Sequence, residues 1–374
     1  MAKVGILTQP LGTNYGGILQ AFALQYVLQE MGHEPLTLDR IRPWYFRMAS
    51  LGWGGLNYIL ERRPKIRMWP NNEELKIITK HTSKFIEEHI SITKPIGSTQ
   101  GLKRTTKEEG IEAIVVGSDQ VWRKAYSPCM SNYFLDFLSD NNQIKKIAYA
   151  ASFGIDEWEF GKNETEYYKS LARKFDAISV REDSAVTLCR HFLGVEATHV
   201  LDPTMLVEKS VYERLASSPI TRPSSGNLFC YVLDRTPQKM SLVDKVAEEK
   251  SLVPFELLPK KIFGEIKSNR ELEDCILPPV EQWLRSFVDA DFVVTDSFHG
   301  TVFSILFNKP FLTIGNESRG LARFFSLLNS FGLNERVISD DDFVGNNSND
   351  IDWNSVSERL NGMRASSKYI LSFI

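Results

Sequence analysis

The stretch VVTDSFHGTVFSILFNKP, Val293–Pro310, joins two different apolar patterns at a single histidine. The residues before Asp296 form a short continuous apolar run, which is typical of a buried strand, and those after Gly300 have helical spacing. A strand followed directly by a helix is the repeating unit of an α/β fold, and ligands of such folds bind beyond the carboxyl ends of the strands. The stretch therefore predicts an α/β domain and marks His299, one of six histidines, as a candidate functional residue.

The same alternation of strand and helix extends along the chain in both directions. At its start, the apolar run Lys3–Thr8 precedes a loop, a helical pattern at Ile18–Met31 and an extended segment at Glu34–Leu38. Further helices are expected at Met240–Lys250 and Val280–Ala290. Further strands are expected at Ile111–Gly117, Lys145–Ser152, Ala177–Val180, Thr198–Leu201, Leu228–Leu233, Leu252–Leu257, Asp291–Thr295 and Phe311–Ile314. This order is typical of parallel, doubly wound sheets.

A chain of 374 residues is long for a single core, so we expect two domains. The Pro- and Ser-rich segment Pro219–Gly226 is a candidate linker between the two series of strands. We predict an N-terminal Rossmann-like domain at residues 1–205 and a C-terminal one at 206–374, facing each other across a cleft. The tail from Trp353 has helical spacing, and we expect this last helix to pack back on the N-terminal domain.

Residues 42–70 interrupt the alternation with several tryptophans and tyrosines among arginines. One interpretation is an amphipathic helical insertion that packs its aromatic side chains on the N-terminal domain. The other is a lid or docking surface for a sugar or a lipid-linked acceptor, since flat aromatic faces suit both. The second interpretation would bring the protein into peripheral contact with a membrane.

Composition excludes several classes of protein. A net charge of −3 argues against general affinity for nucleic acid, which requires a surplus of basic groups. The start of the chain does not have the pattern of a signal peptide, and no apolar run approaches the roughly 20 residues of a membrane span. The four cysteines are widely spaced, which favours free thiols and a cytoplasmic location. No metal-binding motif is present, so we expect no metal and no cofactor.

Polar side chains follow several of the expected strands and form a candidate site. His299 lies near the start of a helix, which attracts anions and keeps an imidazole available as a base. The alternative is that His299 is a structural residue that caps the helix. Arg181 could clamp a carboxylate or phosphate, or lie on the surface. Asp119 could cap a helix, bind sugar hydroxyls or act as a base. Each of these side chains comes directly after an apolar run.

Two loops add weaker candidates. The loop GTNYGG, Gly12–Gly17, precedes a helix and could cradle a phosphate or sugar through its backbone, with Asn14 as a side-chain donor, although a simple tight turn explains it equally well. It lacks the spacing of either nucleotide-binding fingerprint. After the strand at Phe311–Ile314, the run GNESRGLARF offers Arg319 and Arg323, which could instead form a solvated face.

Together these pieces resemble the polysaccharide pyruvyl transferase family. The motifs that carry the resemblance occur in order: TNYGGILQAFALQ, VVGSDQVW, YAASFG, ISVRED, LDPTML, ADFVVTDSFHGTVFSILFNKPFLTIG and SRGLARFFSLL. The resemblance implies a GT-B-like fold of two domains. It also implies transfer of pyruvate from phosphoenolpyruvate (PEP) to two hydroxyls of a sugar in a surface polysaccharide or its precursor, with release of phosphate. The acceptor would be a sugar or a lipid-linked oligosaccharide.

The resemblance also assigns roles to the candidates. His299 would be the acid and base, Arg181 a ligand of PEP, and Asp119 a second base or a contact to the acceptor. Asn14, Gly16 and Gly17 would line the cleft. Many relatives carry arginine two residues before the histidine, where this chain has Ser297, so Arg319, Arg323 or Lys309 would have to supply that charge. Two alternatives remain open: a GT-B-type glycosyltransferase that uses a nucleotide sugar, and a non-catalytic carbohydrate-binding protein.

Overall fold

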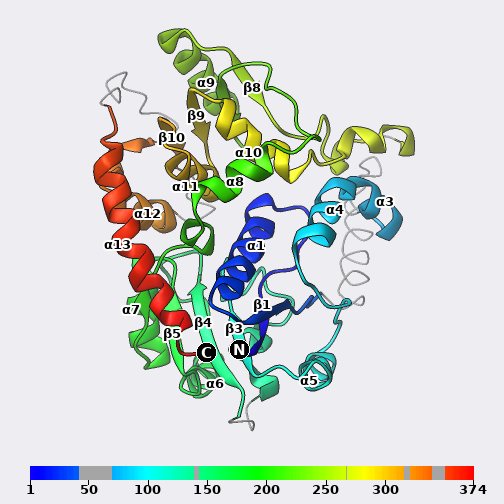
Figure 1. Ribbon diagram of the computed structural model, residues 1–374, viewed down its shortest axis with the longest axis vertical. Coiled ribbons are helices and arrows are strands. Elements are labelled where there is room, and N and C mark those ends of the chain that lie inside the picture. The colour runs from blue at the N-terminus through cyan, green and yellow to red at the C-terminus, as the bar shows by residue number, and fades with distance from the viewer. Residues whose placement is uncertain (42–69, 139–142, 267, 316–320, 339–349) are drawn as a thin grey trace, which may run out of the picture.

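The computed structural model describes residues 1–41, 70–138, 143–266, 268–315, 321–338 and 350–374. They form two parallel β-sheets flanked by helices (Figure 1), with strand orders β2-β1-β3-β4-β5-β6 and β11-β10-β9-β7-β8. The first sheet contains β1 Lys3–Leu7, β2 Glu34–Thr37, β3 Ala113–Val116, β4 Lys145–Ala151, β5 Ala177–Val180 and β6 Thr198–His199. The second contains β7 Leu228–Tyr231, β8 Pro254–Glu256, β9 Phe292–Thr295, β10 Phe311–Ile314 and β11 Val337–Ile338.

The strands are found where the apolar runs predicted them, because helices cover both faces of each sheet. Every residue of β3, β7, β9 and β10 is buried, as expected for parallel strands with two covered faces. The helices are α1 Tyr15–Glu30, α3 Asn72–Ile78, α4 Lys80–His89, α5 Thr99–Glu108, α6 Lys162–Ala172, α7 Asp183–Leu188, α8 Lys209–Ala216, α9 Pro237–Lys250, α10 Val280–Asp289, α11 Phe298–Leu306, α12 Ala322–Phe331 and α13 Trp353–Leu371.

Helix α1 lies at the junction between the two sheets (Figure 1). Its first residue, Tyr15, stacks on Trp283 of α10 with ring centroids 5.8 Å apart and donates a hydrogen bond to the carbonyl of Pro278 at 2.8 Å. Trp283 in turn packs edge-on against Phe303 of α11. One hydrophobic core therefore runs through both domains and fixes the amino end of α1 against the C-terminal domain.

The last helix, α13, runs along both domains (Figure 1). Near its carboxyl end it is tied to the N-terminal half of the chain, because Ser367 Oγ accepts a hydrogen bond from Leu201 N at 3.0 Å. Arg364 donates to the carbonyls of Met205 and Val207 at 2.7 and 2.9 Å. The same helix also packs against α12 of the second domain. No helix in the described ranges is long and apolar enough to cross a membrane.

The structure adds elements that the strand pattern did not predict. Three helices, α3 to α5, lie between β2 and β3, and the short strand β11 extends the second sheet. Helix α11 begins at Phe298, so His299 belongs to its first turn. Residues 42–69 of the aromatic-rich insertion lie outside the described residues.

Candidate active site

Four charged or titratable side chains converge where the strands of the two sheets end. Asp119 follows β3, Arg181 follows β5, Asp202 comes shortly after β6, and His299 follows β9 of the second sheet. All four are buried, with exposed fractions of 8, 4, 2 and 7% respectively. The carboxyl ends of neighbouring parallel strands meet at one edge of a sheet, which brings three of these residues together.

Asp202 is the centre of this group. Its Oδ2 lies 3.2 Å from Nη1 of Arg181 and also accepts a hydrogen bond from Gln20 of α1. Its Oδ1 accepts hydrogen bonds from the backbone N–H of Thr204 at 3.1 Å and from the Thr204 hydroxyl at 2.7 Å. Ser118 Oγ, which accepts from Gln20, lies 3.5 Å from the same carboxylate. The carboxylate is therefore fixed in place by both charged and neutral donors.

These contacts keep Asp202 ionised in spite of its burial. Burial raises the pKa of the Asp202 carboxyl, but His299 and the Arg181 guanidinium outweigh it and hold that pKa well below its usual range. Burial lowers the pKa of Arg181, and the carboxylates of Asp119 and Asp202 more than offset this and raise it. The site therefore contains a permanent buried ion pair.

His299 lies where the two domains touch. Its Nε2 is 3.7 Å from Asp202 Oδ2, which is an ion-pair distance when the imidazole is protonated and too long for a hydrogen bond. The opposite ring atom, Nδ1, faces Gly16, and a Cβ added at Gly16 would overlap the imidazole. Gly16 is therefore required so that the first turn of α1 can approach His299. Two helix amino ends, those of α1 and α11, meet at this ring and favour a negatively charged ligand.

Two guanidinium groups pack against the ring of Phe298, the residue before the histidine. The Cζ of Arg181 lies 4.5 Å from the ring centroid, and that of Arg323, in the first turn of α12, lies 5.6 Å from it. Burial and the nearby charge of Arg181 lower the pKa of Arg323 to about 10, which still leaves it protonated at neutral pH. The ring thus holds two cations near each other in a buried place.

Several donors at this point lack a partner. Within the described residues, Nε and Nη2 of Arg181 and Nε2 of His299 are buried and make no hydrogen bond. Asp119 Oδ1 lies 3.6 Å from Nη2 of Arg181, which is longer than a hydrogen bond. Buried polar groups are nearly always satisfied, so unpaired donors on a cationic side chain indicate the place of an anionic ligand.

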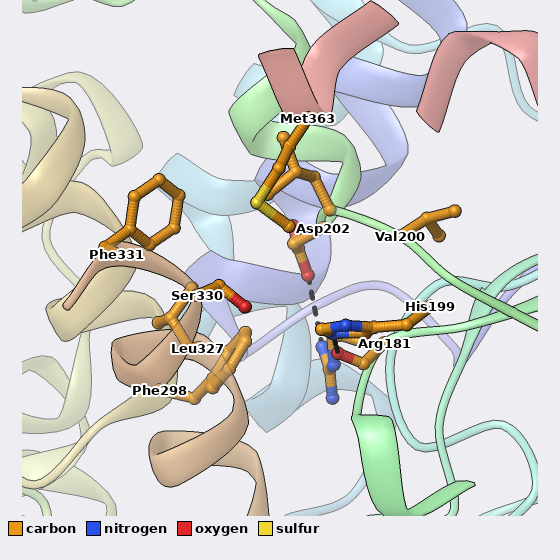
Figure 2. Close-up of a pocket in the computed structure, with 10 residues that line it drawn as sticks. Arg181, His199, Val200, Asp202, Phe298, Leu327, Ser330, Phe331 and Met363 are labelled. Atoms are coloured by element: carbon orange, nitrogen blue, oxygen red, sulfur yellow. Dashed lines mark hydrogen bonds and ion pairs between the residues drawn. The ribbon is translucent and has the colours of Figure 1, made fainter. Parts of the chain in front are cut away.

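A small cavity is lined by Arg181, His199 and Asp202 (Figure 2). Phe298, residues of α12 and Met363 of α13 close it. At its edge, His199 donates a hydrogen bond from Nε2 to the carbonyl of Arg181 at 3.0 Å. The cavity volume of about 10 Å³ is that of about one water. The cavity is therefore too small to hold a substrate.

The structure separates the predicted site residues into two groups. His299, Arg181, Asp119, Gly16 and Arg323 meet as described above. The others do not contribute a side chain to this group. Asn14 is the exposed residue before α1, and a Cβ added at Gly17 would meet the Asn14 side chain and not His299. Ser297 caps α11 by accepting a hydrogen bond from Gly300 N at 3.4 Å. Lys309 lies just before β10, at the amino ends of the strands of the second sheet, and donates a hydrogen bond to the carbonyl of Val288 at 2.9 Å. Arg319 lies outside the described residues.

The residues that sequence reasoning missed are Asp202, Gln20 and Phe298. Asp202 is the second residue of the LDPTML motif and directly follows the expected strand Thr198–Leu201, so its position alone could have marked it. Gln20 is a polar residue in a helix that is otherwise almost wholly buried, which is a weaker signal. Phe298 carries no such signal, because an aromatic residue at a helix start is ordinarily part of the core.

Comparison with known proteins gives a family and a fold. The family model described as polysaccharide pyruvyl transferase matches residues 14–318. No curated protein sequence matches this chain.

Among solved structures, the S. aureus MnaA–UDP co-structure aligns with a TM-score of 0.52 and 11% identity, covering 100% of this chain and 98% of that one. UDP-GlcNAc 2-epimerase from Neisseria meningitidis, bound to UDP-GlcNAc, aligns with a TM-score of 0.48 and 9% identity, covering 100% of this chain and 94% of that one. Acinetobacter baumannii MurG aligns with a TM-score of 0.44 and 11% identity, covering 100% of this chain and 99% of that one. The fold is thus GT-B-like, with two Rossmann-like domains.

Proposed function

Because the chain belongs to the polysaccharide pyruvyl transferase family, we propose that it transfers pyruvate from PEP to two hydroxyls of one sugar. The product is a cyclic ketal, and inorganic phosphate is released. The acceptor is a sugar of a surface polysaccharide or of its precursor, free or lipid-linked. The reaction needs no cofactor and takes place in the cytoplasm, in keeping with the four free cysteines of the chain.

The observation that carries this proposal is the set of unpaired donors on Arg181 and His299. PEP has a carboxylate and a phosphate, so it needs two cationic contacts a few ångströms apart. Arg181 and Arg323, both over the ring of Phe298, offer such a pair. The planar guanidinium of Arg181 can bind an oxyanion with its two remaining donors.

The chemistry requires a proton to be given and then taken. His299, protonated, would donate to the methylene carbon of PEP, which makes the adjacent carbon electrophilic. A sugar hydroxyl attacks that carbon, phosphate leaves, and a second hydroxyl closes the ring. The two hydroxyls lose two protons in all, and these balance the one gained by the methyl group and the one taken by phosphate. The arginines and the two helix amino ends stabilise the charge on the leaving phosphate.

Asp202 would act on the reaction through His299 and Arg181. Its carboxylate lies 3.7 Å from Nε2 and would orient the imidazole for the proton transfer of the first step. The same carboxylate holds Arg181 from one side, at 3.2 Å, and leaves the other donors of the guanidinium facing away. Asp119, with 11% of its side chain exposed, is the base or acceptor contact.

The burial of these side chains has a consequence for binding. Gly16 of α1 and His299 of α11 are in contact, and the four central residues are each at most 8% exposed. Entry of a donor between them requires α1 and α11 to separate. The structure would then correspond to the closed arrangement, which excludes water during proton transfer.

Calorimetric titration with PEP, beside a panel of nucleotide sugars, tests the identity of the donor. We expect saturable binding of PEP that Arg181→Ala weakens by about tenfold or more, because a charge-assisted contact contributes about 1.5–3 kcal/mol. Arg190→Ala is the matched control, since Arg190 is exposed and pairs with Glu196 at 2.9 Å. Binding of a nucleotide sugar without binding of PEP would overturn the proposal in favour of a glycosyltransferase.

A further inference from the structure

A second group of titratable side chains lies between the two domains, on other helices. Glu88 and His89 end α4 of the N-terminal domain, and Glu281 is in the first turn of α10 of the C-terminal domain. One ligand atom from each residue lies within 4.8 Å of the others. Helices α4 and α10 pack on each other, so the group bridges the domains.

Glu281 is the unusual member of this group. It is only 8% exposed, yet within the described residues its carboxylate makes no hydrogen bond or ion pair. It lies in the first turn of α10, where the amino end of the helix favours a negatively charged group. A counter-charge is therefore missing on the side that faces Glu88 and His89.

The other two residues are arranged as ligands rather than as that counter-charge. The imidazole of His89 packs against Phe85 at 4.6 Å and edge-on to Phe22 at 6.1 Å, measured between ring centroids, which fixes its orientation. Glu88 brings a second negative charge, and its only ion pair in the described part of the chain is with Lys84 at 3.7 Å on the same helix. Two carboxylates and one imidazole thus face a common point.

We propose that Glu88, His89 and Glu281 bind one divalent transition-metal ion, of which Zn²⁺ is the best suited, and that this ion links α4 to α10 across the domain junction. Imidazole and carboxylate are common ligands of Zn²⁺, at about 2.0–2.2 Å from the ion. Two ligands of one ion are then at most about 4.4 Å apart. The three ligand atoms already lie within 4.8 Å of one another, so only small side-chain movements separate them from that spacing.

The site has a structural role in this proposal, and it does not depend on the proposed reaction. An ion held by both domains restrains their separation where α4 packs on α10. The expectation of no metal was based on motif spacing, which detects only ligands that are close in sequence. Two of these ligands are adjacent and the third is nearly 200 residues away, so no motif could reveal them.

Calorimetric titration of the whole, chelator-treated chain with ZnCl₂ tests the site. We expect one ion to bind per chain, and Glu281→Gln and His89→Gln each to weaken binding by at least about tenfold. Glu87→Gln is the matched control, because Glu87 is an exposed carboxylate on the same helix outside the group. It should bind Zn²⁺ as the wild type does.

The unfolding temperature gives an independent readout. Zn²⁺ should raise it in the wild type and in Glu87→Gln, a chelator should reverse the rise, and Glu281→Gln should show no rise. If Glu281→Gln fails to fold, Glu88→Gln at an exposed position serves in its place. Absence of saturable binding, or binding that is unchanged in Glu281→Gln and His89→Gln, would overturn the proposal.

Discussion

Asp202 and Asp296 are both buried aspartates that follow a strand, one in each domain, and their surroundings differ in one respect. Asp296 pairs with Lys239 at 2.9 Å and accepts from the backbone N–H groups of Leu233 and Asp234 at 2.7 and 2.9 Å. Asp202 pairs with Arg181, whose Nε and Nη2 remain without a hydrogen bond among the described residues. We interpret the fully paired Asp296 as a structural residue. Asp202 marks a ligand site, because its partner Arg181 keeps donors that make no hydrogen bond in the described part of the chain.

The histidine should give the largest effect. His299→Gln keeps the size and polarity of the side chain but removes its acid–base function, so we expect kcat to fall by about 10²–10⁴-fold. PEP binding measured by calorimetry should persist, because the arginines remain. A variant that loses binding and turnover in equal measure would instead make His299 a ligand of the donor.

The two aspartates should respond differently to loss of charge. Asp296→Asn leaves the buried Lys239 unpaired and should cost about 3–5 kcal/mol of unfolding free energy, measured by urea denaturation. Asp202→Asn should cost less stability, because Asp119 still compensates Arg181, and should lower kcat instead. Equal losses of stability in the two variants would remove the distinction drawn between them.

Gly16 and Gly17 make a matched pair for the contact between α1 and His299. The Cβ of Gly16→Ala would displace the imidazole, and a misplacement of about 1 Å can lower turnover by about 10²-fold. The Cβ of Gly17→Ala would have the Asn14 side chain as its nearest neighbour, with Nδ2 at 3.4 Å, and this variant should keep nearly full activity. If both variants are equally active, the imidazole does not work from the position seen here.

The smallest expected effect is on how the unfolding free energy depends on pH in the acid range. The folded-state pKa of Asp202 lies below its ordinary value of about 3.9, so its stabilising contribution is complete above that pH and is lost as the pH falls further. The unfolding free energy of Asp202→Asn should therefore decline less steeply than that of the wild type below about pH 4. Denaturant titrations at several pH values would measure the two slopes, and parallel slopes would contradict the depressed pKa.

The sequence predicts the parts of this molecule that depend on local pattern. Strands buried on both faces leave continuous apolar runs, and Arg181 and His299 stand directly after such runs, so both could be identified without coordinates. The helices α3 to α5 were missed because they contain few buried residues and do not belong to the strand–helix alternation.

What could not be predicted depends on contacts between distant segments. Gly16 and Gly17 are equivalent in the sequence, and only the approach of α11 from the other domain distinguishes them. Asp296 stands three residues before His299, yet its two carboxylate oxygens accept hydrogen bonds from backbone N–H groups of the loop after β7. The role of Asp202 emerges only when Gln20 of α1 and Arg181 are brought to it.

The most direct test of the account is acceptor-dependent release of phosphate from PEP by the wild-type protein, with the sugar product examined by mass spectrometry. We expect phosphate release only when a suitable sugar or lipid-linked oligosaccharide is present, with one pyruvate joined to the acceptor as a ketal for each phosphate formed. Transfer of a sugar from a nucleotide sugar to the same acceptors, with PEP left intact, would contradict it.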